Sequence, residues 1–192
     1  MKKVFFIGMN RTATKSFHEL FVRSGYKSFH YSCADVLTGE PIILAQEMKN
    51  NLRSYKHVLN RMEAAQVYSD MFWHREDEWI DGVKMYRDLH AQFPDAYFIL
   101  QTRNMYSWLL SKKNHKEGAY IQRVMQYHNL SQDDMLTWFE KDRNEHELNV
   151  RSYFKTSDKF LDYDIDKDNI TKLIDFLKPT FFLDEKHWEH HQ

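Results

Sequence analysis

The chain has 192 residues, of which 16% are aromatic, and it contains only 5 glycines and 3 prolines. This composition excludes a disordered or low-complexity protein, and the length predicts one domain over residues 1–192 with a full hydrophobic core. The net charge of −1 gives no overall positive field for nucleic acid or an anionic membrane, so any positively charged site must be local.

The hydrophobic pattern predicts strands that alternate with helices. The predicted strands are 3–7, 28–31, 66–69, 96–102 and 159–163, and the predicted helices are 14–24, 41–64, 77–92, 107–115 and 167–177, the last ended by Pro179. Residues 119–153 are expected to be helical as well, with Ser131 as an N-cap. Such alternation predicts an α/β fold with a parallel sheet and helices on both faces.

The number of cysteines and the lengths of the apolar runs indicate in which cellular compartment the protein is expected. The single cysteine, Cys33, excludes an intramolecular disulfide and fits a reducing compartment. The apolar run Val4–Ile7 is broken by Asn10 and Arg11 and is too short for the core of a signal peptide. Because no apolar stretch has the length of a membrane span, we expect a cytoplasmic protein.

The most informative segment joins the first strand to the first helix. The apolar run Val4–Ile7 leads into a loop of small, basic and hydroxylated residues, Gly8–Ser16, and then into helical apolar spacing. The first N–H groups of a helix have no intrahelical acceptor and lie at the positive end of its dipole, so they bind phosphate. The side chains that would complete this shell are Arg11, Thr12, Thr14, Lys15 and Ser16. The segment therefore predicts a nucleotide-binding loop.

The loop differs from a Walker A motif. Counted from Gly8, the second glycine is replaced by Ala13, Thr14 stands in the lysine position, and Lys15 comes one place late. This spacing disfavours a kinase or an ATPase. The order Arg11-Thr12-Ala13-Thr14 instead resembles the loop that holds the 5′-phosphosulfate in the sulfotransferases.

A second segment strengthens this resemblance. Pro94 marks a turn, Tyr97–Gln101 is a predicted buried strand, and Arg103 follows at its carboxyl end, where ligands bind in open α/β sheets. In sulfotransferases an arginine at this place and a serine eight residues later bind the 3′-phosphate of the donor. Arg103 and Ser111 have that spacing, and Ser107 is the expected N-cap of the helix that carries Ser111.

The resemblance covers roughly residues 3–31 and 66–112 and points to a compact, mostly microbial branch of the family. It implies a P-loop-type sulfotransferase that uses 3′-phosphoadenosine-5′-phosphosulfate, releases adenosine 3′,5′-bisphosphate and needs no metal. The implied donor-binding residues are Arg11, Thr12, Ala13, Thr14, Lys15, Ser16, Arg103 and Ser111. The acceptor would be a small molecule, a sugar or a lipid headgroup, and the chain could form a homodimer.

Sulfuryl transfer, like phosphoryl transfer, depends on positioning and electrostatics. Arg11, which aligns with the catalytic lysine of the family, is the first candidate to stabilise the leaving oxygen, and Lys15 is the second. An acceptor hydroxyl must also lose a proton. Asp70, at the end of a predicted strand, is the first candidate base, with a structural carboxylate as the alternative; His30 is the second, with a packing role as its alternative.

Two other functions remain open. A small-molecule or nucleotide kinase would need magnesium and ATP. A family member that binds nucleotide without catalysis is suggested by Ala13, whose methyl group could crowd the phosphate, since only glycine adopts positive φ freely. We predict no metal site, because His18-Glu19 is not followed by the second histidine of a zinc-protease helix.

Overall fold

The computed structural model describes residues 1–178 and 180–189. In these residues a seven-stranded sheet has the order β4-β3-β2-β5-β1-β8-β9. Its parallel strands are β2 (Ser28–His30), β5 (Val67–Ser69), β1 (Val4–Phe6), β8 (Tyr97–Thr102) and β9 (Phe160–Asp164). At one edge β3 (Ser32–Ala34) and β4 (Pro41–Ile43) are antiparallel, and β6 (Phe72–His74) pairs with β7 (Trp79–Asp81) in a separate hairpin.

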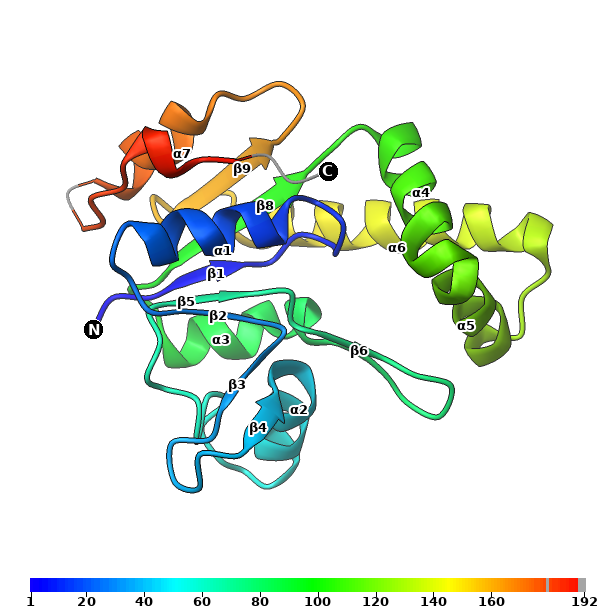
Figure 1. Cartoon of the computed structure of the whole chain (residues 1–192), viewed down its shortest axis with the longest axis horizontal. Coiled ribbons are helices and arrows are strands. Elements are labelled where there is room, and N and C mark those ends of the chain that lie inside the picture. The colour runs from blue at the N-terminus through cyan, green and yellow to red at the C-terminus, as the bar shows by residue number, and fades with distance from the viewer. Residues whose placement is uncertain (179, 190–192) are drawn as a thin grey trace.

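Helices cover both faces of the sheet, as predicted (Figure 1). Because successive strand side chains point to opposite faces, Val4 and Phe6 join one core cluster and Phe5 and Ile7 the other. The first cluster includes side chains of α1 (Thr14–Arg23) and α7 (Ile170–Leu177). The second includes side chains of α2 (Leu44–Arg53), α3 (Tyr86–Gln92) and α6 (Gln132–Tyr153). β1 is therefore buried on both faces, as its continuous apolar run requires.

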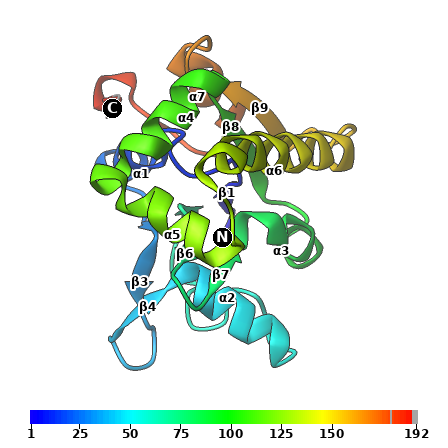
Figure 2. The same ribbon diagram turned by 90° about the vertical axis from the view of Figure 1, so that its right-hand side faces the viewer.

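Two further helices lie beyond the carboxyl ends of the parallel strands. These are α4 (Met105–Asn114) and α5 (Ala119–His128), at the right of Figure 1 and toward the viewer in Figure 2. They are joined by the turn η2 (His115–Gly118), in which Lys116, Glu117 and Gly118 have φ values of 53°, 55° and 86°. No helix of the described residues is long and apolar enough to cross a membrane.

Two predicted helices are wrong in extent. The helix predicted over 41–64 starts only at Leu44, because Pro41–Ile43 pairs with β3, and it ends at Arg53. The Asn51 side chain donates to two carbonyl groups beyond the helix and so holds residues 54–64 in turns. In the helix predicted over 77–92, strand β7 and the 3₁₀ turn η1 (Gly82–Met85) precede α3.

The helix caps are partly as predicted. Ser131 accepts a hydrogen bond from the Asp134 N–H, which confirms it as the cap of α6. The cap of α4 is Asn104, whose side chain accepts from the Ser107 N–H at 3.1 Å, so the prediction of Ser107 is wrong. The last helix begins at Ile170 instead of 167. Pro179, the predicted end of that helix, lies outside the described residues.

Candidate active site

The loop between β1 and α1 is held by side chains that bind its carbonyl oxygens. The four contacts are His146 Nε2 to Ile7 O at 2.7 Å, Thr12 Oγ1 to Met9 O, Trp108 Nε1 to Asn10 O at 2.8 Å and Arg103 Nη1 to Arg11 O at 3.2 Å. Within residues 1–178 and 180–189, the backbone N–H groups from Arg11 to Thr14 have no protein acceptor. Protein side chains thus bind the carbonyl oxygens of the loop, whereas its N–H groups from Arg11 to Thr14 are available to a ligand.

The sequence of this loop suits that arrangement. Gly8 donates its N–H to Gln101 Oε1 at 2.9 Å, and a Cβ at Gly8 would lie 2.0 Å from the Gln101 carbonyl oxygen, so a side chain would push the loop away from β8. Arg11 and Ala13 have φ values of 70° and 60°. Helix α1 has no capping side chain and no acid in its first turn, so its positive end has no negative partner of its own.

A cavity of about 270 Å³, here called the loop cavity, opens over these donors. Its lining residues are Asn10, Arg11, Ala13, Thr14, Lys15, His30, Asp70, Arg103, Ser111 and His115. Arg11 Nε donates to Ser111 Oγ at 3.0 Å, and the buried Nε of Arg103 has no hydrogen-bond partner among the described residues. The structure therefore brings most of the predicted donor-binding residues to one cavity.

Three predicted residues are placed differently from the rest. The side chains of Thr12 and Ser16 are buried beside the loop and do not line the cavity, so any contact they make with a ligand is through their N–H groups. Lys15 does line it, but 64% of its side chain is exposed and its Nζ lies 3.7 Å from Glu19 Oε1. Arg11 is consequently the better placed of the two predicted catalytic cations.

A second cavity of about 400 Å³, here called the hairpin cavity, adjoins the first. Its lining residues are Asn10, His30, Tyr31, Asp70, Phe72, His74, Arg75, His115, Lys116, Tyr120 and Arg123. Asn10, His30, Asp70 and His115 line both cavities and form the shared wall. A group held in one cavity can therefore meet a group held in the other at these four side chains.

The two candidate bases lie together on the shared wall. His30 Nε2 is 3.9 Å from Asp70 Oδ2 and 3.2 Å from Thr14 Oγ1. Burial lowers the pKa of His30, with a further lowering by Lys15 that the Asp70 carboxylate opposes, so the imidazole is neutral near pH 7. Asp70 has φ of 54° and turns the chain from β5 toward the hairpin. A carboxylate and a neutral imidazole are thus both available to accept a proton.

A buried polar network supports the shared wall from behind. His74 Nε2 is 2.8 Å from Asp81 Oδ1, and His74 Nδ1 is 3.0 Å from Tyr120 Oη. Because burial lowers the pKa of His74, we assign a neutral ring that donates to Asp81 and accepts from Tyr120. Lys112 Nζ donates to Tyr120 Oη at 3.3 Å and to Asn10 Oδ1. The network thus connects the hairpin to the loop through Lys112, whose pKa burial lowers to about 7.

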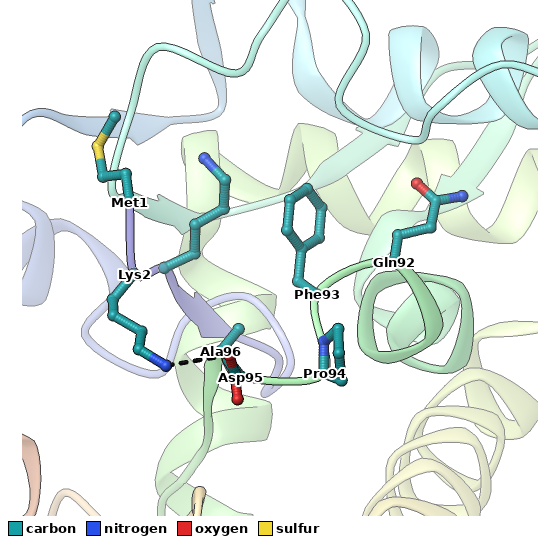
Figure 3. A pocket seen from close by; sticks show the side chains of 8 residues that line it. Met1, Lys2, Gln92, Phe93, Pro94, Asp95 and Ala96 are labelled. Atoms are coloured by element: carbon teal, nitrogen blue, oxygen red, sulfur yellow. Dashed lines mark ion pairs between the residues drawn. The ribbon is translucent and has the colours of Figure 1, made fainter.

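Another cavity, of about 300 Å³, lies at the opposite, amino-terminal end of β1 and β8 (Figure 3). Its mouth holds an exposed ion pair between Lys2 and Asp95 at 3.2 Å. The Lys3 ammonium is turned to the carbonyl groups of Glu63 and Ala65 and is occupied there. This cavity lies at the end of the strands away from the β1–α1 loop, and ligands of open α/β sheets bind at the carboxyl ends of the strands, so we place the active site at the carboxyl edge.

The parallel sheet, its two helical layers and the strand–loop–helix segment at its carboxyl edge define an α/β fold of the P-loop type. A family model described as a sulfotransferase domain matches residues 3–180. The chain belongs to this family and is a sulfotransferase. No curated protein matches it.

Sequence reasoning missed several residues of the site. Asn10 and Lys112 are adjacent in sequence to the predicted Arg11 and Ser111. This adjacency is the signal by which the sequence could have indicated them. His74 comes to the site on the hairpin and Tyr120 comes on α5. No local sequence pattern predicts this tertiary arrangement.

Proposed function

We propose that this sulfotransferase takes the sulfuryl group of 3′-phosphoadenosine-5′-phosphosulfate and transfers it to a hydroxyl or amine of a small acceptor. The observation that carries the proposal is the β1–α1 loop: side chains bind its carbonyl groups, and its N–H groups from Arg11 to Thr14 have no acceptor among the described residues. Such a loop at a helix N-terminus suits the 5′-phosphosulfate, which is an anion.

Arg103 and Ser111 would hold the 3′-phosphate of the same donor. Both line the loop cavity, and the buried Nε of Arg103 has no hydrogen-bond partner in the described part of the chain. A phosphate would satisfy this donor and would also accept from the Ser111 hydroxyl, which now accepts from Arg11. The donor would then connect the β1 loop to α4 through its two phosphate ends.

In the proposed reaction the acceptor oxygen attacks sulfur, and the bond between sulfur and the 5′-phosphate oxygen breaks. The bonding electrons go to that oxygen, which leaves on adenosine 3′,5′-bisphosphate, and the acceptor proton goes to a base on the protein. Arg11, with Lys15 second, would stabilise the leaving oxygen as charge develops on it. We propose that no metal is needed, because the sulfuryl group carries less charge than a phosphoryl group.

The base is proposed to be Asp70, with the neutral His30 beside it as the second candidate. Both lie on the shared wall, where an acceptor in the hairpin cavity would reach a donor in the loop cavity. We propose a small-molecule, sugar or lipid-headgroup acceptor, since the hairpin cavity of about 400 Å³ is of small-molecule size. A cytoplasmic location and a homodimer stay predictions.

Isothermal titration with adenosine 3′,5′-bisphosphate tests the donor. The wild-type chain should bind it without magnesium, and Arg103→Ala should weaken binding by roughly 10- to 100-fold, the value of a charge-assisted hydrogen-bonded contact. Arg53→Ala, which removes an exposed arginine outside both cavities, should leave the affinity unchanged. Preference for magnesium ATP would contradict the proposal and favour a kinase. Bisphosphate binding with no transfer to any acceptor of a broad panel would favour a binding protein.

A further inference from the structure

Two arginines, Arg75 and Arg123, line the hairpin cavity. Arg75 follows β6 and Arg123 lies on α5, and both are half-buried. Their Nη1 atoms donate to the same acceptor, the carbonyl oxygen of His74, at 3.0 and 3.1 Å. In the part of the chain that the structure describes, no ion pair includes either guanidinium. The two guanidinium groups therefore share one neutral acceptor, and within the described residues neither is paired directly with a carboxylate.

Within the described residues, the hydrogen bonds and ring contact of the Arg75 guanidinium are all with neutral groups. Its Nη2 donates to Tyr31 Oη at 3.3 Å, and its Cζ lies 4.1 Å from the centre of the Trp73 ring. These contacts orient the guanidinium without neutralising it. A planar, pre-positioned guanidinium with unused N–H groups is suited to a carboxylate, sulfate or phosphate.

The charges around the cavity have the same sign bias. Lys116 is a third cation of the lining, and its left-handed φ of 53° belongs to the turn that carries it over the cavity. Asp70, on the shared wall, is the one carboxylate among the lining residues in the described chain. Burial lowers the pKa of both His74 and His115, so these rings are neutral near pH 7 and the positive charge of the lining comes from Arg75, Arg123 and Lys116. The end of the cavity away from Asp70 is thus positive.

We propose that the acceptor carries an anionic group, a carboxylate, sulfate or phosphate, which Arg75 and Arg123 bind in the hairpin cavity. This inference rests on the proposed function, because it assigns the hairpin cavity to the acceptor. The hydroxyl that receives the sulfuryl group then lies at the opposite end, on the wall with Asp70. The aromatic lining from Tyr31, Phe72 and Tyr120 would contact the apolar body between the two groups.

The test uses two probes of nearly the same size and shape, one anionic and one neutral. With adenosine 3′,5′-bisphosphate held at saturation, 4-hydroxybenzoate and its neutral amide, 4-hydroxybenzamide, are titrated by calorimetry. The wild-type chain should bind the carboxylate about 10-fold more tightly or better, as expected for a charge-assisted contact. The R75Q/R123Q variant should lose this preference. R53Q/K56Q, which removes the same charge at exposed positions outside the cavity, should keep it.

Binding of neither probe, equal binding of both by the wild-type chain, or a preference that persists in R75Q/R123Q would overturn the proposal. Failure of the wild-type chain to bind the bisphosphate would instead overturn the proposed donor. Because the bisphosphate lies in the loop cavity, unchanged affinity for it in R75Q/R123Q shows that the variant is folded. If the double substitution destroys the affinity for the bisphosphate, the single R123Q variant is tested instead, and it should reduce the preference for the carboxylate over the amide.

Discussion

At the scale of single residues, the backbone is most unusual where the two cavities lie. Nine non-glycine residues of the described chain have positive φ. Five of them, Arg11, Ala13, Tyr31, Asp70 and Lys116, line the loop cavity or the hairpin cavity. Left-handed backbone is costly for residues with a Cβ, and such residues concentrate where a ligand is held. The carboxyl edge of this sheet is therefore the part of the fold in which local stability is given up for a particular arrangement of side chains.

The first prediction concerns Ala13, which has φ of 60° at the start of α1. Ala13→Gly should raise the free energy of unfolding by about 1 kcal/mol, because glycine adopts this conformation without strain. Urea unfolding measures the change. Ala34→Gly, at an exposed position of β3 without positive φ, should show no gain. A less stable A13G chain would mean that the packing of the Ala13 methyl group outweighs its backbone strain. A higher affinity of A13G for the bisphosphate would show that this methyl group crowds the phosphate.

The second prediction separates the roles of Asp70. Asp70→Asn should lower turnover by roughly 10²- to 10⁴-fold, the usual contribution of a general base, while bisphosphate affinity changes little. Steady-state kinetics and calorimetry give the two numbers independently. Asp77→Asn, an exposed acid in the hairpin turn, serves as the control. Unchanged turnover in D70N would remove Asp70 from this role, and the same comparison would then be made with His30→Asn.

At the scale of secondary-structure elements, local pattern predicts what local forces determine. The apolar runs of β1 and β8 and the periodic apolar face of α7 suffice to place these elements within a few residues. Residues 54–64 have no comparable signal. Their turns depend on distant contacts, such as the hydrogen bond from the Val58 N–H to Gln92 Oε1 of α3 at 2.7 Å. A prediction from helical spacing alone therefore continues α2 too far.

The same distinction divides the candidate site. Asp70 and Arg103 come directly after parallel strands, and Arg11 lies in the loop that follows β1. The carboxyl ends of parallel strands meet at one edge of the sheet, so it was predictable that these residues lie together. Arg75 and Arg123 are different, because their common acceptor, His74 O, joins a hairpin to α5. The place of α5 depends on the turn η2. The sequence predicts a break there, but the residue types of Lys116 and Glu117 do not indicate their left-handed conformation.

The third prediction tests the connection that α4 makes with the loop. Lys112 is buried, and burial lowers its pKa to about 7 from an ordinary value near 10.5. Between these two pH values the unfolded chain holds a proton that the folded chain has released, so stability rises with pH. Relative to Lys112→Met, the wild-type chain should gain up to roughly 1.4 kcal/mol per pH unit above pH 7.

Urea unfolding of both chains between pH 6.5 and 9.5 measures this difference. Comparison between variants removes the effect of every other group that titrates in the range. Lys113→Met, at the exposed neighbouring position, should run parallel to the wild-type chain at all pH values. Parallel curves for K112M as well would show that Lys112 stays charged in the fold, held by Asn10 and by the aromatic rings around it.

At the scale of the whole molecule, a net charge of −1 conceals a strong local excess of positive charge. Arg11 and Arg103 line one cavity and Arg75 and Arg123 the next, and none of the four has an ion-pair partner within residues 1–178 and 180–189. Such a distribution attracts small anions to one edge of the sheet without making the surface as a whole attractive to polyanions. It agrees with the choice of a small acceptor over nucleic acid.

The last prediction concerns how the donor site affects the stability of the entire chain. Adenosine 3′,5′-bisphosphate would be bound by the β1 loop and α4 together, and these elements are further tied to α6 by Arg143 and His146. At 100 times its dissociation constant the ligand should add about 2.7 kcal/mol to the free energy of unfolding. For a chain of this length that corresponds to a rise in Tm of about 5–10 °C.

If the chain is one domain, circular dichroism and tryptophan fluorescence should report a single shared unfolding transition, and the ligand should raise its Tm equally by both probes. Adenosine, which lacks phosphates, should not raise the Tm, and Arg103→Ala should reduce the shift at equal ligand concentration. A shift seen by one probe alone would mean that the donor site and the rest of the sheet unfold separately, and that residues 1–192 do not form the single domain that their length predicts.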